Sequence, residues 1–162
     1  MPISGTFCRV RLPTILFADA DADARFVYHS VAADAGFGVE LASDGYEAVA
    51  LAHFALPDLI VLETRLAGYD GFDVIRRLRA SPLTEPIPIV IASSEDGAAY
   101  EEQVRASGGD GWLTKPFSAE VLLRLAAVLL ICHRREPLLE TPGLAACDPE
   151  QPPPLRAIGR ST

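Results

Sequence analysis

Three short apolar runs, each meeting a polar residue at its end, constrain the fold of this chain more than any other feature. They are Thr14–Asp19 (TILFAD), Asp58–Glu63 (DLIVLE) and Ile87–Ala92 (IPIVIA). The first two end in an acid, and two serines follow the third. Continuous apolar runs of this length are typical of parallel strands that are buried on both faces of a sheet. We therefore expect the chain to build its core around a parallel sheet.

Weaker strand signals and helical spacing fill the intervals between these runs. Two shorter strand candidates are Gly38–Ala42 and Gly111–Thr114. The predicted helices are Asp23–Ala35, Asp44–Ala55, Phe72–Ala80, Ala98–Ser107 and Ser118–Cys132. The stripe expected on the first helix consists of Phe26, Val27, Ser30 and Val31. Five strands that alternate with five helices predict an α/β fold with a doubly wound parallel sheet between two helical layers.

Composition divides the chain into three parts. Its 162 residues fit one domain with additional segments. We expect an N-terminal extension over residues 1–13, one domain over residues 14–133 and a Pro-rich segment over residues 134–162. The prolines of that last part are Pro137, Pro142, Pro149, Pro152, Pro153 and Pro154. Because little apolar periodicity accompanies them, the composition favours a flexible tail, and the segment is too short for an output domain.

Charge and hydropathy argue against two classes of partner. The formal net charge is −8 and no basic face is visible, so the phosphate backbone of a nucleic acid would repel the chain. No apolar window has the length of a membrane span, and the first thirteen residues lack the apolar region of a secretory signal. Cys8, Cys132 and Cys147 are too widely spaced for a disulfide framework or a zinc site. We therefore expect a cytoplasmic protein without membrane or nucleic-acid partners.

The carboxyl ends of the predicted strands bring four polar side chains together. In doubly wound sheets the functional crevice lies beyond these ends. The first strand ends at Asp19 and the third at Glu63, Ser93 follows the fourth strand, and Lys115 follows the fifth. The sequence thus predicts that two acids, a hydroxyl and an ammonium group meet in one small pocket.

These residues lie in sequence motifs that resemble those of the CheY-like receiver domains of response regulators. The motifs are ILFADAD at the first strand, PDLIVLETRLAGYDGFDVIRRLR around the third, PIVIASS at the fourth and GGDGWLTKPF at the fifth. The resemblance extends from about Thr14 to Cys132. It implies a flavodoxin-like sheet with the strand order 2-1-3-4-5 and a role in two-component, phosphorelay signal transduction.

Three positions depart from the pattern that this resemblance implies. Family members have two adjacent acids after the first strand, which help to hold Mg²⁺, whereas this chain has Asp19 followed by Ala20. They have a phosphate-accepting aspartate at the end of the third strand, where this chain has Glu63. A proline commonly follows a few residues later, and here Ala67 takes that place. We interpret the phosphorylation site as degenerate.

Four other positions match the family. Ser93 corresponds to the hydroxyl that bonds the phosphoryl group, and Lys115 corresponds to the lysine that pairs with that group. Trp112 falls where the family has a switching aromatic residue, with packing at the sheet edge as an equal alternative. The peptide bond between Lys115 and Pro116 is cis in the family, which would aim the lysine into the pocket.

Elementary geometry predicts that this pocket is not phosphorylated. Glutamate is one methylene longer than aspartate, and a nucleophile displaced by about 1 Å can react about 10²-fold more slowly. We expect Glu63 to reach Lys115 directly and to form a permanent ion pair. With one acid fewer than usual we expect no resident cofactor, and Asp19 is the ligand that Mg²⁺ would use if it bound. Asp21 and Asp23 are expected to cap the next helix rather than to hold a metal.

The last predicted helix is apolar on nearly every face and reads VLLRLAAVLLIC from Val121 onward. If one face packs against the sheet, Leu123, Val128 and Ile131 stay partly exposed. We predict a protein-partner or homodimer interface on this face. The alternative is that the Pro-rich segment folds over it.

The leading functional prediction is a stand-alone, atypical receiver that is not an enzyme and that acts by binding a sensor kinase or a downstream effector. One alternative is a receiver that still switches through phosphorylation or a metal at this pocket. A second alternative is a flavodoxin-like protein that binds a flavin or a nucleotide. The loop from Ala20 to Asp23 argues against the second alternative, because it is acidic and lacks the glycine of a phosphate-binding turn.

Overall fold

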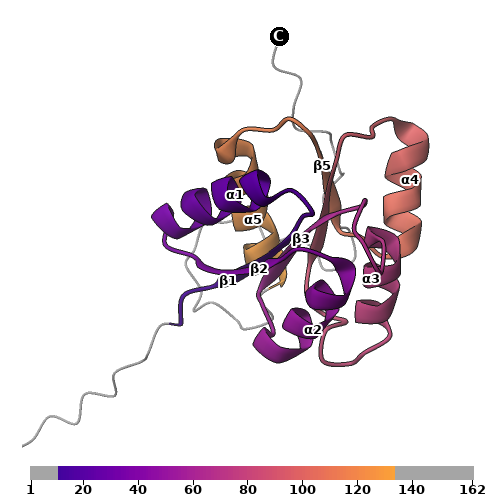
Figure 1. Cartoon of the computed structure of the whole chain (residues 1–162), viewed down its shortest axis with the longest axis horizontal. Coiled ribbons are helices and arrows are strands. Elements are labelled where there is room, and N and C mark those ends of the chain that lie inside the picture. Colours follow the sequence, from indigo (N-terminus) through magenta and orange to yellow (C-terminus); the bar gives the residue numbers. More distant parts are fainter. Residues whose placement is uncertain (1–10, 134–162) are drawn as a thin grey trace, which may run out of the picture.

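Five strands and five helices alternate along residues 11–133, the part of the chain that the computed structural model describes (Figure 1). The strands are β1 (Thr14–Ala18), β2 (Gly38–Ala42), β3 (Leu59–Glu63), β4 (Ile89–Ser93) and β5 (Gly111–Thr114). The helices are α1 (Ala22–Asp34), α2 (Gly45–Ala55), α3 (Gly71–Arg79), α4 (Ala98–Ser107) and α5 (Ala119–His133). Every element predicted from the sequence is present, although several bounds move by a residue or two.

The strands form one parallel sheet in the order β2-β1-β3-β4-β5. Phe17 on β1 lies between Leu41 on β2 and Val61 on β3, so β1 is an interior strand, and β3 is the central strand of the sheet. The predicted fold class and strand order, a doubly wound five-stranded sheet of the flavodoxin-like type, are therefore confirmed.

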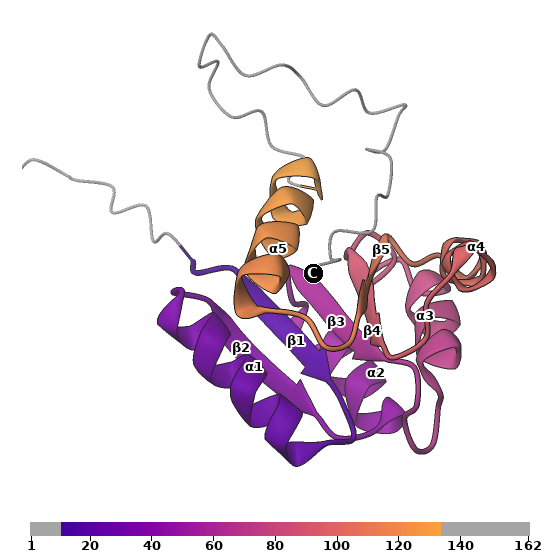
Figure 2. The same cartoon turned by 90° about the horizontal axis from the view of Figure 1, so that it is seen from above.

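Helices cover both faces of the sheet, with α2, α3 and α4 on one side and α1 and α5 on the other (Figures 1 and 2). Successive side chains of a strand point to opposite faces, so the two layers share every strand. Leu16 and Ile60 are fully buried under the first set of helices, and Ile15 and Val61 are buried under the second. Each such side chain contributes about 1.5–3 kcal/mol to folding, and the resulting rigid sheet fixes where its strand ends lie.

The buried face of α1 differs from the stripe expected from the sequence. Phe26 and Val27 are 71% and 54% exposed, and the helix buries Tyr28 and Ala32 instead. Tyr28 stacks on Phe17 from β1, with ring centroids 5.2 Å apart. The prediction was wrong because apolar residues lie on two sides of this helix, and a tertiary aromatic contact decides which side turns inward.

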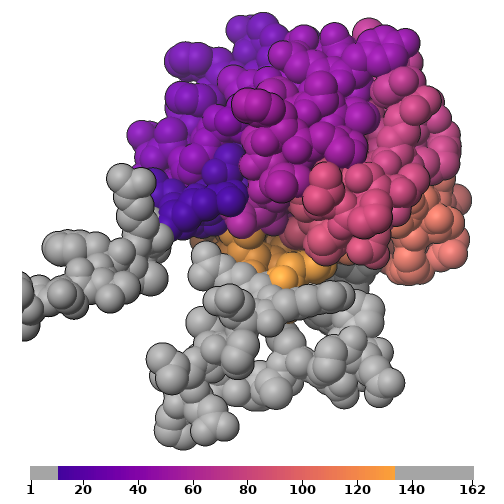
Figure 3. All heavy atoms as spheres, turned by 90° about the horizontal axis from the view of Figure 1, so that it is seen from below, coloured from indigo at the N-terminus to yellow at the C-terminus, as the bar shows by residue number. Residues whose placement is uncertain are grey.

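The last helix, α5, buries Leu122 and Leu129 against the sheet and leaves Val128 and Ile131 46% and 63% exposed. Leu123 is half-buried. Part of α5 is visible at the surface in the view from below (Figure 3). The expected exposure of this helix face is therefore confirmed. None of the helices within residues 11–133 is long and apolar enough to cross a membrane.

Asp110 ties the beginnings of β4 and β5 to two helices. Its Oδ2 accepts hydrogen bonds from the Ile89 amide at 2.7 Å and from Arg79 Nη2 on α3 at 2.8 Å. His133, at the end of α5, places Nε2 3.7 Å from Asp110 Oδ1. The nearby carboxylate of Asp110 is the main cause that raises the pKa of His133 above its ordinary value.

Several predictions fall on parts of the chain outside the described residues. They concern most of the N-terminal extension, the Pro-rich segment, Cys8 and Cys147. Within the described part, the first residue, Arg11, forms an ion pair of 3.1 Å with Asp58 just before β3.

Candidate functional site

The ends of four strands place the predicted pocket residues side by side. Asp19 directly follows β1, Glu63 is the last residue of β3, Ser93 is the last residue of β4, and Lys115 directly follows β5. Register brings these ends to one edge, since Ala18 pairs with Leu62, Glu63 with Ala92, and Ser93 with Thr114. The structure thus brings together all four side chains that the sequence assigned to the pocket.

Lys115, the only lysine of the sequence, forms the centre of the site. Its Nζ donates to Asp19 Oδ2 and to Glu63 Oε2, each at 2.6 Å. Burial by itself would lower the pKa of Lys115, but the hydrogen bonds to these two carboxylates outweigh burial and raise it. The expected ion pair between Glu63 and Lys115 is present, and Asp19 shares it.

The second carboxylate oxygen of Glu63 is also fully engaged. Oε1 accepts from the Thr64 amide at 2.8 Å and from the Arg65 amide at 3.3 Å, and it lies 3.1 Å from Thr64 Oγ1. Burial by itself would raise the pKa of Glu63, but the hydrogen bonds from Lys115 and from the Arg65 amide together lower it below the ordinary value. The side chain of Glu63 is therefore an ionised carboxylate held in one orientation at both oxygens.

Asp19, on the other side of Lys115, is also held in place by hydrogen bonds. Its Oδ1 accepts from the Asp21 amide at 2.9 Å, and its backbone oxygen accepts from Arg25 Nη1 at 2.6 Å. Asp21 in turn caps α1, since its Oδ1 accepts from the Asp23 amide at 2.8 Å. The expected capping role of Asp21 is confirmed, whereas Asp23 is an exposed residue of the first helical turn.

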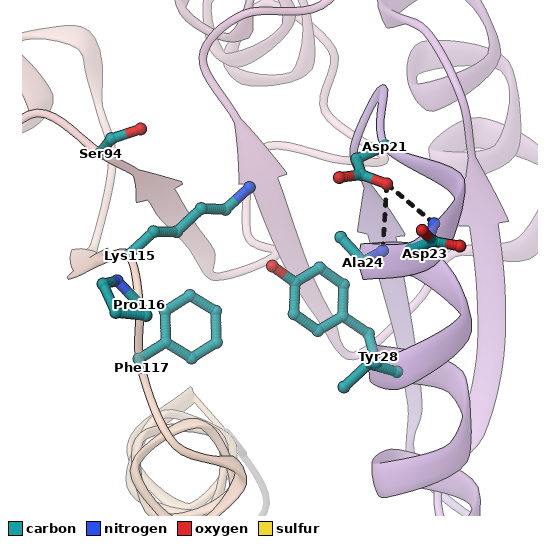
Figure 4. A pocket seen from close by; sticks show the side chains of 9 residues that line it. Asp21, Asp23, Ala24, Tyr28, Ser94, Lys115, Pro116 and Phe117 are labelled. Atoms are coloured by element: carbon teal, nitrogen blue, oxygen red, sulfur yellow. Dashed lines mark hydrogen bonds between the residues drawn. The ribbon is translucent and has the colours of Figure 1, made fainter.

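Tyr28 is a site residue that the sequence did not reveal. Its ring stacks on Phe17 and on Phe117, and its hydroxyl points toward the ammonium group of Lys115 (Figure 4). Burial raises the pKa of the Tyr28 phenol, against an opposing effect of Lys115. A groove beside these residues is lined by Asp21, Asp23, Ala24, Val27, Tyr28, Ser94, Lys115, Pro116 and Phe117. No periodicity could have identified Tyr28, because its position beside Lys115 depends on how the fold brings α1 and the loop after β5 together.

Ser93 is buried at the pocket, but Thr64 stands between it and Glu63. Ser93 Oγ accepts from the Glu95 amide at 3.2 Å and lies 3.2 Å from Thr64 Oγ1. Thr64, itself buried, is the second residue that the sequence reasoning missed. Its position directly after Glu63 was the signal that could have found it.

Trp112 and Pro116 occupy the fifth strand and the loop after it. Trp112 is half-buried and packs against the core on the side of α2, α3 and α4. The peptide bond between Lys115 and Pro116 is cis, as expected. A switching role of Trp112 stays a prediction.

A helix cap and a close backbone contact explain the motif GYDGFD, which leads into α3. Asp70 caps this helix, with its Oδ1 accepting from the Asp73 amide at 2.8 Å. A Cβ atom added at Gly71 would lie 2.7 Å from the Glu63 backbone oxygen and 2.8 Å from Thr64 Cα. The start of α3 therefore packs directly on the backbone that carries Glu63, which only glycine permits.

The acids at this edge are already engaged by groups of the chain itself. Mg²⁺ requires a nearly octahedral shell of oxygen ligands at about 2.1 Å. Asp19 and Glu63 both turn an oxygen to the same ammonium group, Ala20 offers no donor, and Asp21 caps a helix. Within residues 11–133 no group of three or more His, Cys, Asp or Glu side chains is arranged to hold a metal ion.

A family model and many known proteins match this chain. The model described as the response regulator receiver domain matches residues 15–127. The response regulator PleD of Caulobacter vibrioides is 36% identical over 104 residues, which are 64% of this chain and 23% of PleD. A regulator of Synechocystis described as DNA-binding, RpaA, is 36% identical over 119 residues, or 74% of this chain and 49% of RpaA. The chain thus spans about half or less of the length of these relatives.

Solved structures agree with the sequence matches. The chemotaxis protein CheY4 of Vibrio cholerae superposes with a TM-score of 0.70 at 29% identity, covering 74% of this chain and 99% of that protein. The receiver domain of the sensor histidine kinase PA1611 of Pseudomonas aeruginosa superposes with a TM-score of 0.69 at 25% identity. The superposition covers 74% of this chain and 98% of the PA1611 domain, whose active-site cleft coordinates a magnesium ion.

Proposed function

The chain belongs to the response regulator receiver domain family of two-component signalling, and from that premise we propose that it signals without being phosphorylated. In this proposal Glu63 is a built-in substitute for the phosphorylated residue. Its ion pair with Lys115 holds the pocket in one state, and the protein acts by binding other proteins rather than by catalysis.

The contact between Glu63 Oε2 and Lys115 Nζ, 2.6 Å long, carries this proposal. A carboxylate that accepts from an ammonium at one oxygen and from amides at the other is held in one orientation and is not free to turn toward an incoming phosphorus atom. A nucleophile must lie near its target and point toward it, and a misplacement of about 1 Å costs about 10²-fold in rate. Phosphoryl transfer to Glu63 would require the side chain to give up hydrogen bonds that hold this orientation.

Charge sets the limit of this substitution. A glutamate carries one negative charge, whereas a phosphoryl group adds about −1.5 to −2. Asp19 adds a second carboxylate at 2.6 Å from the same ammonium group. The two acids outnumber the ammonium group of Lys115 by a single negative charge, so the electrostatic need for a magnesium ion is small.

Acetyl phosphate supplies the test of this function. Purified protein is incubated with acetyl phosphate and Mg²⁺, and its intact mass is then measured by mass spectrometry. We expect the wild-type protein to keep its mass, because Glu63 is engaged at both oxygens. We expect the double variant Ala20→Asp/Glu63→Asp to gain a phosphoryl group, because it restores the second acid and the shorter nucleophile.

Ala20→Asp alone is the matched control, since it adds the missing acid but keeps Glu63, and it should remain unmodified. A phosphoryl adduct on the wild-type protein would refute the proposal and revive the switchable receiver. A flavin spectrum or thermal stabilisation by a nucleotide would revive the second alternative.

Partners and location follow from the same role. A sensor kinase or a downstream effector is the proposed partner, in the cytoplasm, and the net charge of −8 favours a protein partner over a nucleic acid. The stand-alone mode of action stays a prediction. An immunoblot that measures the size of the native protein in its own cells checks it.

A further inference from the structure

Thr64 connects the acid of the pocket to the serine of the neighbouring strand end. Thr64 Oγ1 lies 3.1 Å from Glu63 Oε1 and 3.2 Å from Ser93 Oγ, and Ser93 Oγ accepts from the Glu95 amide at 3.2 Å. Both hydroxyls are buried. A continuous chain of polar atoms thus runs from the end of β3 to the loop that follows β4.

Charge decides the direction of the protons in this chain. A hydroxyl has one proton to donate, and Glu63 is the only anion at either end of the pair of hydroxyls. Thr64 therefore donates to Glu63, and Ser93 donates to Thr64. Each hydroxyl that donates becomes a better acceptor for its own partner, so the carboxylate strengthens the hydrogen bond from the Glu95 amide two steps away.

We propose that Thr64 is a positioning residue that relays the charge of Glu63 to Ser93 and so fixes the loop between β4 and α4. The inference rests on the proposed function, because it names the route by which the built-in acid acts on its surroundings. The serine is held through a neighbouring hydroxyl of this chain instead of through a phosphoryl group.

A second link between the same two loops is too weak to do this. Arg65 Nη2 lies 3.2 Å from Glu95 Oε1, but the two side chains are 77% and 51% exposed. Exposed ion pairs are screened by water and salt and often contribute nothing measurable. The buried hydroxyls of Thr64 and Ser93 are therefore the effective connection.

Hydrogen exchange of the Glu95 amide tests the relay in a double-mutant cycle. Glu63→Gln removes the negative charge that orders the relay, and its NH₂ group must face donors whichever way it turns, Lys115 on one side and the Thr64 and Arg65 amides on the other. We expect exchange at the Glu95 amide to accelerate about tenfold, the loss of one hydrogen bond. In Thr64→Val, exchange at the Glu95 amide should accelerate by a similar factor. The double variant Thr64→Val/Glu63→Gln should exchange at a rate within about twofold of that of Thr64→Val alone.

Two further variants separate the relay from a general loss of structure. Thr64→Ser keeps the hydroxyl and should restore slow exchange, whereas Arg65→Gln removes only the exposed ion pair and should leave exchange within about twofold of wild type. Amides of β3 and β4 report whether each variant is folded, and Thr64→Ala replaces Thr64→Val if the latter is not.

The relay would be overturned if Glu63→Gln accelerated exchange of the Glu95 amide as much in Thr64→Val as in wild type. It would also be overturned if Glu63→Gln alone left the exchange rate of the Glu95 amide unchanged. The acetyl phosphate assay on the same proteins keeps the two claims apart. A phosphoryl adduct on the wild-type protein overturns the proposed function. If no adduct forms but the double-mutant cycle shows no coupling between Glu63 and Thr64, only the relay is overturned.

Discussion

At the scale of single residues, one methylene group explains the site. Glu63 extends far enough from the end of β3 to place Oε2 2.6 Å from Lys115 Nζ while Oε1 still accepts from the amides that follow it. Lys115 Nζ also donates to Asp19 Oδ2 at 2.6 Å, and the Tyr28 hydroxyl points toward the same ammonium group. The ammonium group is thus surrounded by oxygen atoms that the chain itself supplies.

The shifted pKa values of this pair predict a stability profile with two limits. The lowered pKa of Glu63 means that its contribution is complete above its ordinary pKa of 4.5 and is lost as the pH falls through the folded-state pKa. The raised pKa of Lys115 means that its contribution is complete below its ordinary pKa of 10.5 and is lost as the pH rises toward the folded-state pKa. The pair should therefore stabilise the fold most between these two ordinary values.

Urea unfolding of wild type and Glu63→Gln across the pH range measures this contribution. We expect wild type to be more stable by about 1–3 kcal/mol at about pH 7 and the difference to shrink at both extremes. Glu120→Gln, which removes an exposed acid of α5, is the control and should show no such profile. A difference that is the same at all pH values would contradict the ion pair.

At the scale of elements, the predictable parts were those that depend on local pattern. Buried parallel strands need continuous apolar runs, and parallel pairing then carries Asp19, Glu63, Ser93 and Lys115 to one edge whatever the details of packing. The inner face of α1 was predicted wrongly, because the stacking of Tyr28 depends on residues remote in sequence. Thr64 was missed although it directly follows Glu63, because its contact with Ser93 exists only once β3 and β4 are adjacent.

The start of α3 offers a prediction at this scale. Gly71→Ala would improve helix propensity by up to about 1 kcal/mol in an open helix. Here the new methyl group meets the backbone of Glu63 and Thr64 at 2.7 and 2.8 Å, so we expect a loss of about 1–3 kcal/mol and a fall in Tm.

The control is Ala98→Gly at the exposed first residue of α4, which should cost only the propensity difference of under about 1 kcal/mol. A Gly71→Ala variant as stable as wild type in thermal unfolding would contradict the close packing of α3 on the pocket.

At the scale of the whole molecule, the exposed apolar face of α5 remains without a partner among the described residues. Val128 and Ile131 are 46% and 63% exposed on a helix whose other face packs against the sheet. Apolar patches of this kind mark interaction surfaces. We expect the protein to form a homodimer through this face.

Analytical ultracentrifugation tests the dimer with two substitutions of equal chemistry. Ile131→Glu should weaken association by at least about 10²-fold, because it buries a charge in an apolar interface. Phe26→Glu changes an apolar residue on α1 that is at least as exposed as Ile131 and should leave association unchanged. A monomeric wild-type protein, or dissociation by both substitutions alike, would contradict this interface.

The most direct test follows the ammonium group of Lys115 itself. Because the chain has no other lysine, protein labelled with ¹⁵N-lysine gives one side-chain ammonium signal in an NMR spectrum. We expect this signal to be unchanged when Mg²⁺ and acetyl phosphate are added to wild type, and to move when they are added to Ala20→Asp/Glu63→Asp. A saturable shift of the wild-type signal would show that Lys115 exchanges its carboxylate partners for a metal-bound or phosphoryl group, and would contradict the account.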